Sequence, residues 1–354
     1  MQEPFTQDML LATSPNAGGT SLIALGTATV IDQEDTTGIW ISEGGVFRNV
    51  IASIPDSEAP YKRVMQLQSF STVSGKKVLM EDDQFDFHDI LYHENRLYLV
   101  STGTNEVISL TKEGEEIKRY SYPGHNDSWH INCLGIWDGR VVLSAFGEFD
   151  SMRGYKHNSL HRGFVIDLES GTKLWEYLSQ PHTPAQWGNK YYICNSESKQ
   201  VLIKDRAANV QCLQFDGYTR GIAFGDEFMY IGLSQSRNVE GATEGRSTAR
   251  IVAVDISTHQ ICGEVSLPFL EIYDIRILQK QHYFVLPMML GLNGEDLRTR
   301  LHERAHQLDE RSRQLECVAA GLQRINSHIV TGTIIRLVSR LKQDDTFGNP
   351  SCKY

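Results

Sequence analysis

Hydrophobic and polar positions along the chain repeat one pattern several times. Two apolar runs of about five or six residues, rich in β-branched and aromatic side chains, flank a short polar turn such as "HENR", "WDGR" or "FGDE". Runs of this length separated by turn residues predict pairs of antiparallel strands. The copies begin at Thr37, Phe87, Trp129, Pro181, Thr219 and Tyr273, and the copy at Thr37 is the most degenerate.

One or two further strand-like runs follow most copies, so the repeating unit has about four strands in roughly 40–50 residues. Two of these runs, "VIDLESGTKLWEY" and "AVDISTHQICGEV", are near-duplicates of a strand, a polar turn and a strand. Such a unit is typical of a propeller blade.

The number of blades follows from closing the ring. The last copy supplies little more than one innermost strand near Asp274, whereas the N-terminal segment supplies strands that have no innermost partner. Pairing the two leaves no open sheet edge. We therefore predict an all-β protein with a six-bladed β-propeller over residues 1–290; because the copy at Thr37 is weak, five and seven blades stay open.

The β pattern ends near Leu290, and residues 291–354 differ in character. This segment is rich in Leu, Arg, Glu and Gln and predicts a C-terminal helical extension of one or two helices from about Glu295 to Leu341. Its apolar seam packs either on the propeller or its own second half, or forms a coiled-coil contact in a homo-oligomer. The seam repeats every seven residues, at Leu301, Leu308, Leu315, Leu322 and Ile329.

Composition narrows the possible partners and the compartment. The net charge is −10 and no run of Lys or Arg forms a basic stripe, which disfavours nucleic acid and anionic membranes. No stretch has the roughly 20 apolar residues of a membrane span, and the N-terminus lacks the basic region of a secretory signal. The six cysteines include no CxxC pair. We expect a cytoplasmic protein.

The residues that start the predicted innermost strands are the main candidates for chemistry. His88, His130, His182, Arg220 and Asp274 hold matching places in successive copies, so they should face one mouth of the central channel. Three neutral imidazoles could bind a divalent metal (Zn, Fe, Mn or Cu), with Asp274 completing or orienting the set.

Simpler interpretations stay open. A histidine at a strand start is usually a hydrogen-bonded structural group, and duplication of an ancestral blade could repeat such a residue. Without a metal, the same ring could combine acid–base groups with an anion site. The predicted substrate-binding residues are Arg220, Asn132, Arg276 and Asp89. Arg220 and Arg276 suit a substrate carboxylate or phosphate, and Asn132 lies on the channel side, whereas the side chain of Asp89 should point to the other face of its strand.

Five serial phrases carry a family resemblance: "FHDI", "WHINCLGIWDGR", "QPHTPAQW", "YTRGIAF" and "EIYDIRIL". Over about residues 9–280 the chain resembles an uncharacterised bacterial β-propeller family whose typical phrases are HD, HxNG, PHSP, TRG and EIYD. It departs from them at Cys133, where glycine is usual, and at Thr183, where serine is usual. The resemblance points to His88, Asp89, His130, Asn132, His182, Arg220, Tyr273 and Asp274 as site residues, and it implies no reaction.

The function hypotheses follow from this ring. The first is an enzyme acting on a small anionic or sugar-like molecule at the mouth, with a metal on the histidines and with Asp274, Arg220 and Tyr273 as catalytic candidates; hydrolysis, elimination and oxygen chemistry are all open. Metal-dependent propeller lactonases and lyases are similar only at the level of fold. The second is a non-catalytic ligand- or partner-binding module with an oligomerising tail, and the third is a scaffold with a vestigial ring.

Overall fold

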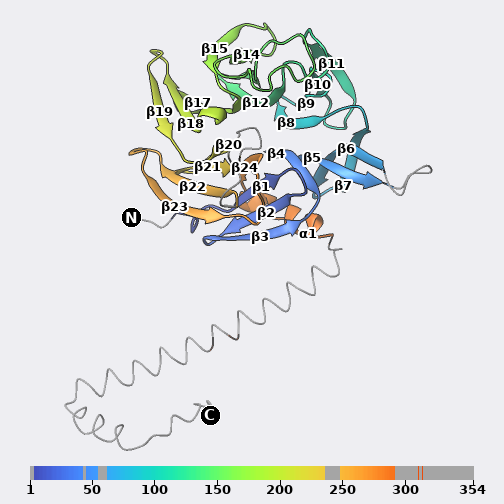
Figure 1. The fold of residues 1–354 in the computed structure, drawn as a ribbon. Coiled ribbons are helices and arrows are strands. Elements are labelled where there is room, and N and C mark those ends of the chain that lie inside the picture. The colour runs from blue at the N-terminus through green and yellow to red at the C-terminus, as the bar shows by residue number, and fades with distance from the viewer. Residues whose placement is uncertain are drawn as a thin grey trace, which may run out of the picture. The chain divides into compact units, whose positions relative to one another are not determined.

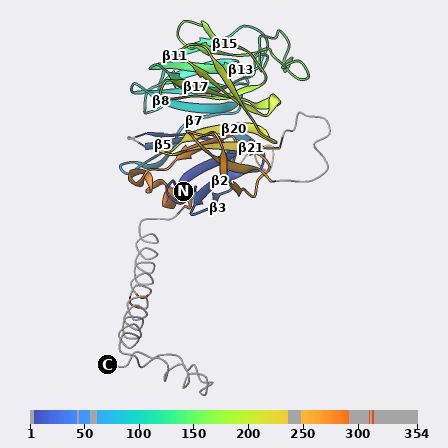
Figure 2. The same ribbon diagram turned by 90° about the vertical axis from the view of Figure 1, so that its left-hand side faces the viewer.

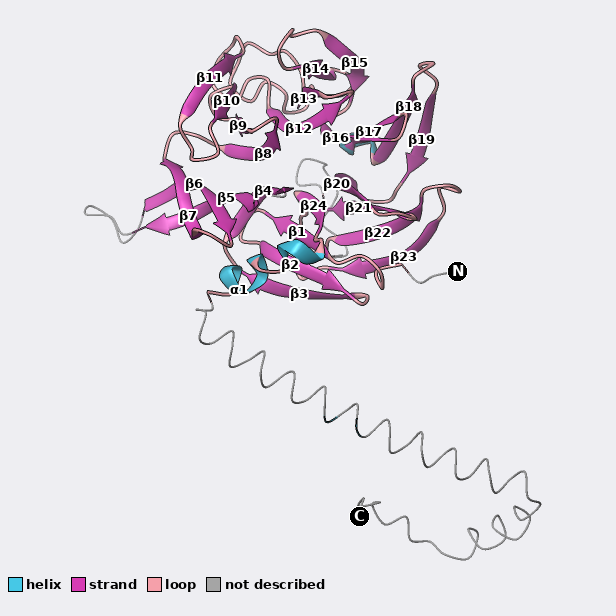
Figure 3. Cartoon of the chain, turned by 180° about the vertical axis from the view of Figure 1, so that it is seen from behind, coloured by secondary structure: helices cyan, strands magenta, loops and turns pink. Residues whose placement is uncertain are grey.

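The structure is a computed structural model that describes residues 4–42, 45–54, 62–235 and 248–291, together with residues 310 and 313. Its strands form six antiparallel sheets of four strands each, arranged as the blades of a propeller (Figure 1). The all-β prediction and the blade number six are thus confirmed. Helix is rare in the described residues of the propeller, where the α-helix α1 (Val285–Met289) has five residues (Figure 3).

Five blades are built from consecutive strands. The first contains β4 (Asp35–Ser42), β5 (Gly45–Ile54), β6 (Lys62–Ser71) and β7 (Gly75–Asp82). The second contains β8 (Phe87–His93), β9 (Arg96–Ser101), β10 (Glu106–Leu110) and β11 (Glu116–Ser121). The third contains β12 (Ile131–Trp137), β13 (Arg140–Ala145), β14 (Gly163–Asp167) and β15 (Lys173–Leu178). The fourth contains β16 (Pro181–Trp187), β17 (Lys190–Asn195), β18 (Gln200–Asp205) and β19 (Val210–Gln214). The fifth contains β20 (Tyr218–Phe224), β21 (Phe228–Ser234), β22 (Arg250–Asp255) and β23 (Ile261–Ser266).

The sixth blade combines the two ends of the propeller. Strand β24 (Asp274–Ile277) pairs with β1 (Leu10–Ser14), which pairs in turn with β2 (Gly19–Ala24) and then β3 (Thr27–Asp32). The first strands of the blades, β4, β8, β12, β16, β20 and β24, contact one another in sequence, and β24 contacts β4. They therefore form the inner ring around the channel, and Figure 2 shows the same blades after a quarter turn.

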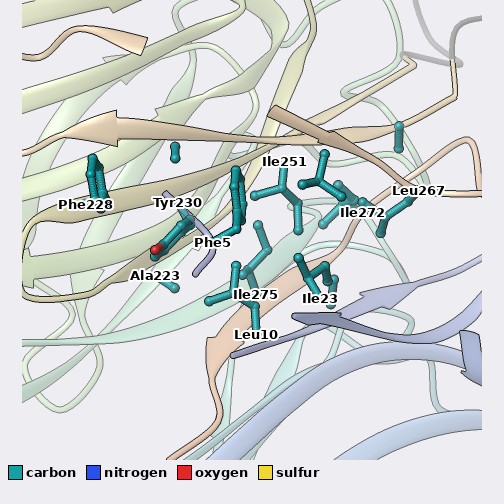
Figure 4. Close-up of a cluster of buried hydrophobic side chains, with 14 residues drawn as sticks. Phe5, Leu10, Ile23, Ala223, Phe228, Tyr230, Ile251, Leu267, Ile272 and Ile275 are labelled. Atoms are coloured by element: carbon teal, nitrogen blue, oxygen red, sulfur yellow. The ribbon is translucent and has the colours of Figure 1, made fainter. Parts of the chain in front are cut away.

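Apolar side chains between neighbouring blades make up the core. One buried cluster joins the fifth and sixth blades, where Tyr230 of β21 and Ile275 of β24 lie near Leu10 of β1 (Figure 4). Phe5 from the N-terminal segment packs on Tyr230 with ring centroids 5.3 Å apart. Each fully buried leucine or isoleucine contributes about 1.5–3 kcal/mol, so these contacts hold the ring together. The outermost strands, such as β11, are mostly exposed.

The inner strands share an irregularity that shapes the channel mouth. The pairing of the first with the second strand shifts register near the start of five inner strands, for example between Phe87 and Ile90 and between Ile131 and Leu134. A β-bulge of this kind bends the strand and changes where side chains point. Thr37 and His88 lie within two of these irregularities.

The predicted helical extension over residues 291–354 lies almost entirely outside the described residues, and so does its proposed contact with a second copy. Within the part of the chain that is described, no helix combines the length and the apolar character needed to cross a bilayer.

Candidate functional site

A cavity of about 550 Å³ opens where the inner strands begin, and we call it the mouth cavity. Thr37, His88 and Arg220 line it from inner strands, and His130 and Tyr273 line it from the residues directly before β12 and β24. Loop residues complete the wall, among them Asp86, Asp127, Phe146, Arg153 and Tyr155. The predicted mouth thus contains two of the three histidines and the predicted arginine, together with groups that the pattern did not indicate.

His88 and His130 form a pair in the wall of the mouth cavity. Their ring centroids are 5.3 Å apart in an edge-on arrangement. Each ring is held at Nδ1 by its own carboxylate: Nδ1 of His88 lies 3.1 Å from Asp86, and Nδ1 of His130 lies 2.7 Å from Asp127. This leaves the two Nε2 atoms as the ring nitrogens for a ligand. His130 also has a left-handed φ of 48°, a strained backbone value that is often found at functional sites.

The surroundings shift the pKa values of the two imidazoles in opposite directions. Burial opposes the charged form of His88, but the nearby Asp86 carboxylate outweighs it and raises the pKa of His88. Burial is the stronger influence on His130 and lowers its pKa, although Asp127 partly compensates. Desolvation opposes the charged form of the Asp86 carboxyl, but the neighbouring His88 outweighs it and helps to lower the pKa of Asp86 to about 2. Two neighbouring groups with diverging pKa values are suited to act as acid and base.

His182 lies behind this pair and has a different set of partners. Its Nδ1 is 3.0 Å from the carbonyl oxygen of Gln180 and 2.9 Å from Oγ of Ser196. Since the carbonyl can only accept, Nδ1 carries the proton, and Nε2 accepts a hydrogen bond of 3.0 Å from Nη2 of Arg220. Burial and the Arg220 charge lower the pKa of His182 well below its usual value, so the ring is neutral.

This arrangement does not fit the predicted three-histidine metal site. Both nitrogens of His182 are occupied by protein groups, and a metal ligand needs a free ring nitrogen. In the described segments, no group of three or more His, Cys, Asp or Glu side chains is placed to hold a metal ion. We therefore assign no chemical step to a metal on His88, His130 and His182.

Asp274 and Arg276 lie outside the mouth cavity and bind each other. Nε of Arg276 is 2.9 Å from a carboxylate oxygen of Asp274, and its Cζ lies 4.4 Å from the centre of the Trp40 ring. Asp274 also accepts a hydrogen bond of 2.8 Å from the backbone N–H of Ile275. The predicted catalytic role of Asp274 and substrate-binding role of Arg276 therefore gain no support from their position.

Asp89 is the structural counterpart of Asp274. Its Oδ1 accepts a hydrogen bond of 2.9 Å from the backbone N–H of Ile90, and its Oδ2 accepts one of 2.7 Å from the N–H of Leu134 in the next blade. Because this local pattern matches Asp274 and Ile275, the equivalent of His88 in the sixth blade is Tyr273, the residue directly before β24 and one residue earlier than we predicted. Asp89 and the fully buried Asn132 are absent from the wall of the mouth cavity and hold backbone instead.

Tyr273 does reach the mouth cavity, with its ring rather than its hydroxyl. The hydroxyl donates 2.8 Å to the carbonyl oxygen of Asn132, whereas the ring centroid lies 5.9 Å from that of His88. Burial raises the pKa of Tyr273 well above its usual value, so the hydroxyl stays protonated. These contacts favour a packing role over proton transfer.

Several residues of the site were missed by sequence reasoning. Asp86 and Asp127 precede their histidines by two and three positions, and this short spacing could have indicated them. Arg153 and Tyr155 come from the long loop between β13 and β14, and they contact Asp127 at 2.9 Å and 3.3 Å. No local pattern marks that loop as part of the mouth.

Comparisons with known proteins support the fold. A family described as a domain of unknown function (DUF4915) matches residues 66–288. A chain of a nidogen/laminin complex is 10% identical with a TM-score of 0.55, over 77% of this chain and 99% of that one. The virginiamycin B lyase of Staphylococcus aureus is 11% identical with a TM-score of 0.46, over 74% and 85% of the two chains. No curated protein matches the sequence. At such identities the structural likeness concerns the fold alone.

Proposed function

The chain belongs to the DUF4915 family of domains of unknown function, so neither its family nor its fold implies a reaction. From the geometry of the site, we propose that the protein is an enzyme that performs general acid–base catalysis on a small anionic or sugar-like substrate in the mouth cavity. The observation that carries this proposal is the His88–His130 pair. The two imidazole rings lie 5.3 Å apart, and a separate carboxylate fixes each of them. Their pKa values are shifted in opposite directions, and perturbed titratable groups of this kind gather at functional sites more than in ordinary packing.

His130 acts as the general base. Asp127 accepts the Nδ1 proton of the neutral ring, so the Nε2 lone pair is available to take a proton from the substrate or from an attacking water. Asp127 also stabilises the imidazolium that forms, in the way a triad carboxylate does. The position of His130 before the strand, with its strained backbone, directs the ring towards the cavity.

His88 acts as the general acid. Its raised pKa keeps a larger fraction of the ring protonated near neutral pH, and its Nε2 proton can pass to a leaving group or a developing oxyanion. Arg220 supplies the positive charge that binds an anionic group of the substrate. Hydrolysis and elimination are both served by this set of groups.

The test is a panel of sugar lactones, 4-O-linked uronides and aryl esters, followed by titration of released acid and by ultraviolet absorbance. We expect turnover of at least one class, a bell-shaped pH profile, and a loss of about 100-fold or more in His88→Gln and His130→Gln. Turnover that survives both substitutions would overturn the assignment. Ligand binding without turnover of any compound would favour the non-catalytic binding module.

A further inference from the structure

The guanidinium of Arg220 is held in one orientation. Its Cζ lies 5.6 Å from the ring centre of Tyr218 and 5.3 Å from that of Tyr273. Nη1 donates a hydrogen bond of 3.3 Å to Oε2 of Glu271, and Nη2 donates one of 3.0 Å to Nε2 of His182. A guanidinium fixed by two aromatic rings, a carboxylate and a neutral imidazole cannot follow a ligand by changing rotamer, so the ligand must fit it.

Burial decides which nitrogen atoms of Arg220 a ligand can reach. Nε is fully buried and has no hydrogen-bond partner, whereas the side chain as a whole keeps 11% of its surface and lines the mouth cavity. The accessible N–H groups are therefore on Nη1 and Nη2. Two N–H groups at the end of a planar fork match the two oxygens of a carboxylate.

The charges around the mouth cavity limit the charge of the ligand. Arg220 is paired with Glu271 behind it, and Arg63 at the rim is 3.2 Å from Asp35. Arg153 is paired with Asp127. The charged side chains in the described wall are Arg63, Arg153, Lys156 and Arg220 on one side and Asp83, Asp86 and Asp127 on the other. Three of these four cations already pair with a carboxylate, Arg63 with Asp35, Arg153 with Asp127 and Arg220 with Glu271. The wall therefore offers little unpaired positive charge to a phosphate ester, which carries about −1.5 to −2 near neutral pH.

The rest of the mouth cavity suits a polar ligand body. Asn16, Thr37 and Asp83 contribute amide, hydroxyl and carboxylate groups to the wall. The cavity volume of about 550 Å³ lies within the range of about 300–1,000 Å³ that is typical of small-molecule sites. A chain of hydroxyl groups could hydrogen-bond to these side chains.

We propose that Arg220 selects the singly charged carboxylate of a polyhydroxy acid over a phosphate ester or a neutral polyol of similar size. His182 is the positioning residue that fixes the guanidinium, rather than a metal ligand. This inference rests on the proposed function, because it names the substrate class of the same cavity.

The test is calorimetric binding of three probes with a six-carbon skeleton to the full chain at constant ionic strength: D-gluconate, D-glucose 6-phosphate and sorbitol. We expect gluconate to bind at least about 10-fold more tightly than either of the others. Sorbitol lacks the charge-assisted hydrogen bonds to Arg220, and the phosphate ester brings more negative charge than the paired wall can neutralise. Arg220→Gln should abolish the preference. The matched control Arg206→Gln, which removes an exposed arginine paired with Asp138, should keep it.

His182→Gln and Arg220→Lys separate positioning from charge. The glutamine can still accept from Arg220 and should retain part of the preference, whereas lysine keeps the charge but loses the fork and should lose most of it. Tighter binding of the phosphate ester, equal binding of sorbitol, or no binding of all three probes by the wild-type protein would overturn the inference. Turnover of the panel that still depends on His88 and His130 would then leave the proposed function standing.

Discussion

Two histidine environments at one mouth differ in their partners. Nδ1 of His130 donates to the Asp127 carboxylate, and its Nε2 remains for a ligand. His182 donates instead to a backbone carbonyl, and its Nε2 is taken by the Arg220 guanidinium. The same side chain is thus prepared for proton transfer in one place and fixed as a neutral acceptor in the other. The partner of the ring, more than its place in the repeat, determines what it can do.

The largest effect on activity should come from removing the carboxylate that holds His130. In Asp127→Asn the amide can turn its N–H₂ group towards the ring and favour the tautomer with the proton on Nε2, which cannot act as a base. We expect kcat/KM for the best compound of the panel to fall about 100-fold or more, with little change in the unfolding free energy.

Asp138→Asn is the matched control, because this carboxylate lies in a surface turn and pairs with Arg206 and Tyr191. It should retain full activity. Equal activity of Asp127→Asn and Asp138→Asn across the pH range would remove the reason for treating His130 as the base.

The carboxylates one residue deeper in the channel should affect stability rather than activity. Asp89→Ala leaves the buried N–H groups of Leu134 and Ile90 without their acceptor, and we expect a loss of about 1–3 kcal/mol in urea unfolding. Burial, and then the nearby Asp274 charge, raises the pKa of Asp89 to about 7.

Because the pKa of Asp89 is raised, the stability difference between Asp89→Asn and the wild-type protein should depend on pH. The folded protein holds the Asp89 proton between about pH 4 and pH 7, where the unfolded chain has lost it, so the contribution of Asp89 to stability falls as the pH rises through this window. Asn cannot ionise, so the variant should gain stability relative to wild type as the pH is raised. A pH-independent difference would contradict a protonated Asp89.

These carboxylates also show where sequence reasoning stopped. The alternation of short apolar runs and polar turns was sufficient to predict the blades, because every blade buries its strands in the same way. To predict the residues at the mouth, equivalent positions of the inner strands had to be aligned exactly. Counting from His88 assigned Asp274 to the position that Tyr273 occupies in the structure. β24 pairs with β1 from the N-terminal segment, whereas the other inner strands pair with the strand that follows them. A count along the chain therefore does not carry the register into the sixth blade.

The partners of the histidines were harder to predict than the histidines themselves. His88, His130 and Arg220 do meet at the mouth, as expected from strands that start at one end of a channel. Tyr155, however, lies far along a loop with no regular structure, and its approach to Asp127 depends on how that loop folds back. Long-range loop contacts of this kind have no local signal.

A smaller but more direct measurement separates the three rings. NMR titration should give His88 a pKa above the usual 6.5 and His130 a pKa below it, with His182 staying neutral through this range. Protonated His88 stabilises the fold below pH 6.5 and loses this effect as the pH rises through its folded pKa; His130 has the opposite sign, because acid must charge a buried ring. Asp86→Asn should lower the pKa of His88. A single shared value for both rings would contradict the acid–base division.

The smallest effect should come from Arg153, the exposed partner of Asp127. Its side chain is 51% exposed, and Nε donates 2.9 Å to the carboxylate oxygen that does not hold His130. Solvent and salt screen such a pair, so Arg153→Gln should cost less than about 1 kcal/mol in unfolding free energy. Because Asp127 keeps its contact with His130, kcat/KM should decrease only slightly, and the decrease should shrink further at high salt. A loss as large as that of Asp127→Asn would mean that Arg153 itself binds the substrate, and the division between the two histidine environments would then have to include the loop that carries it.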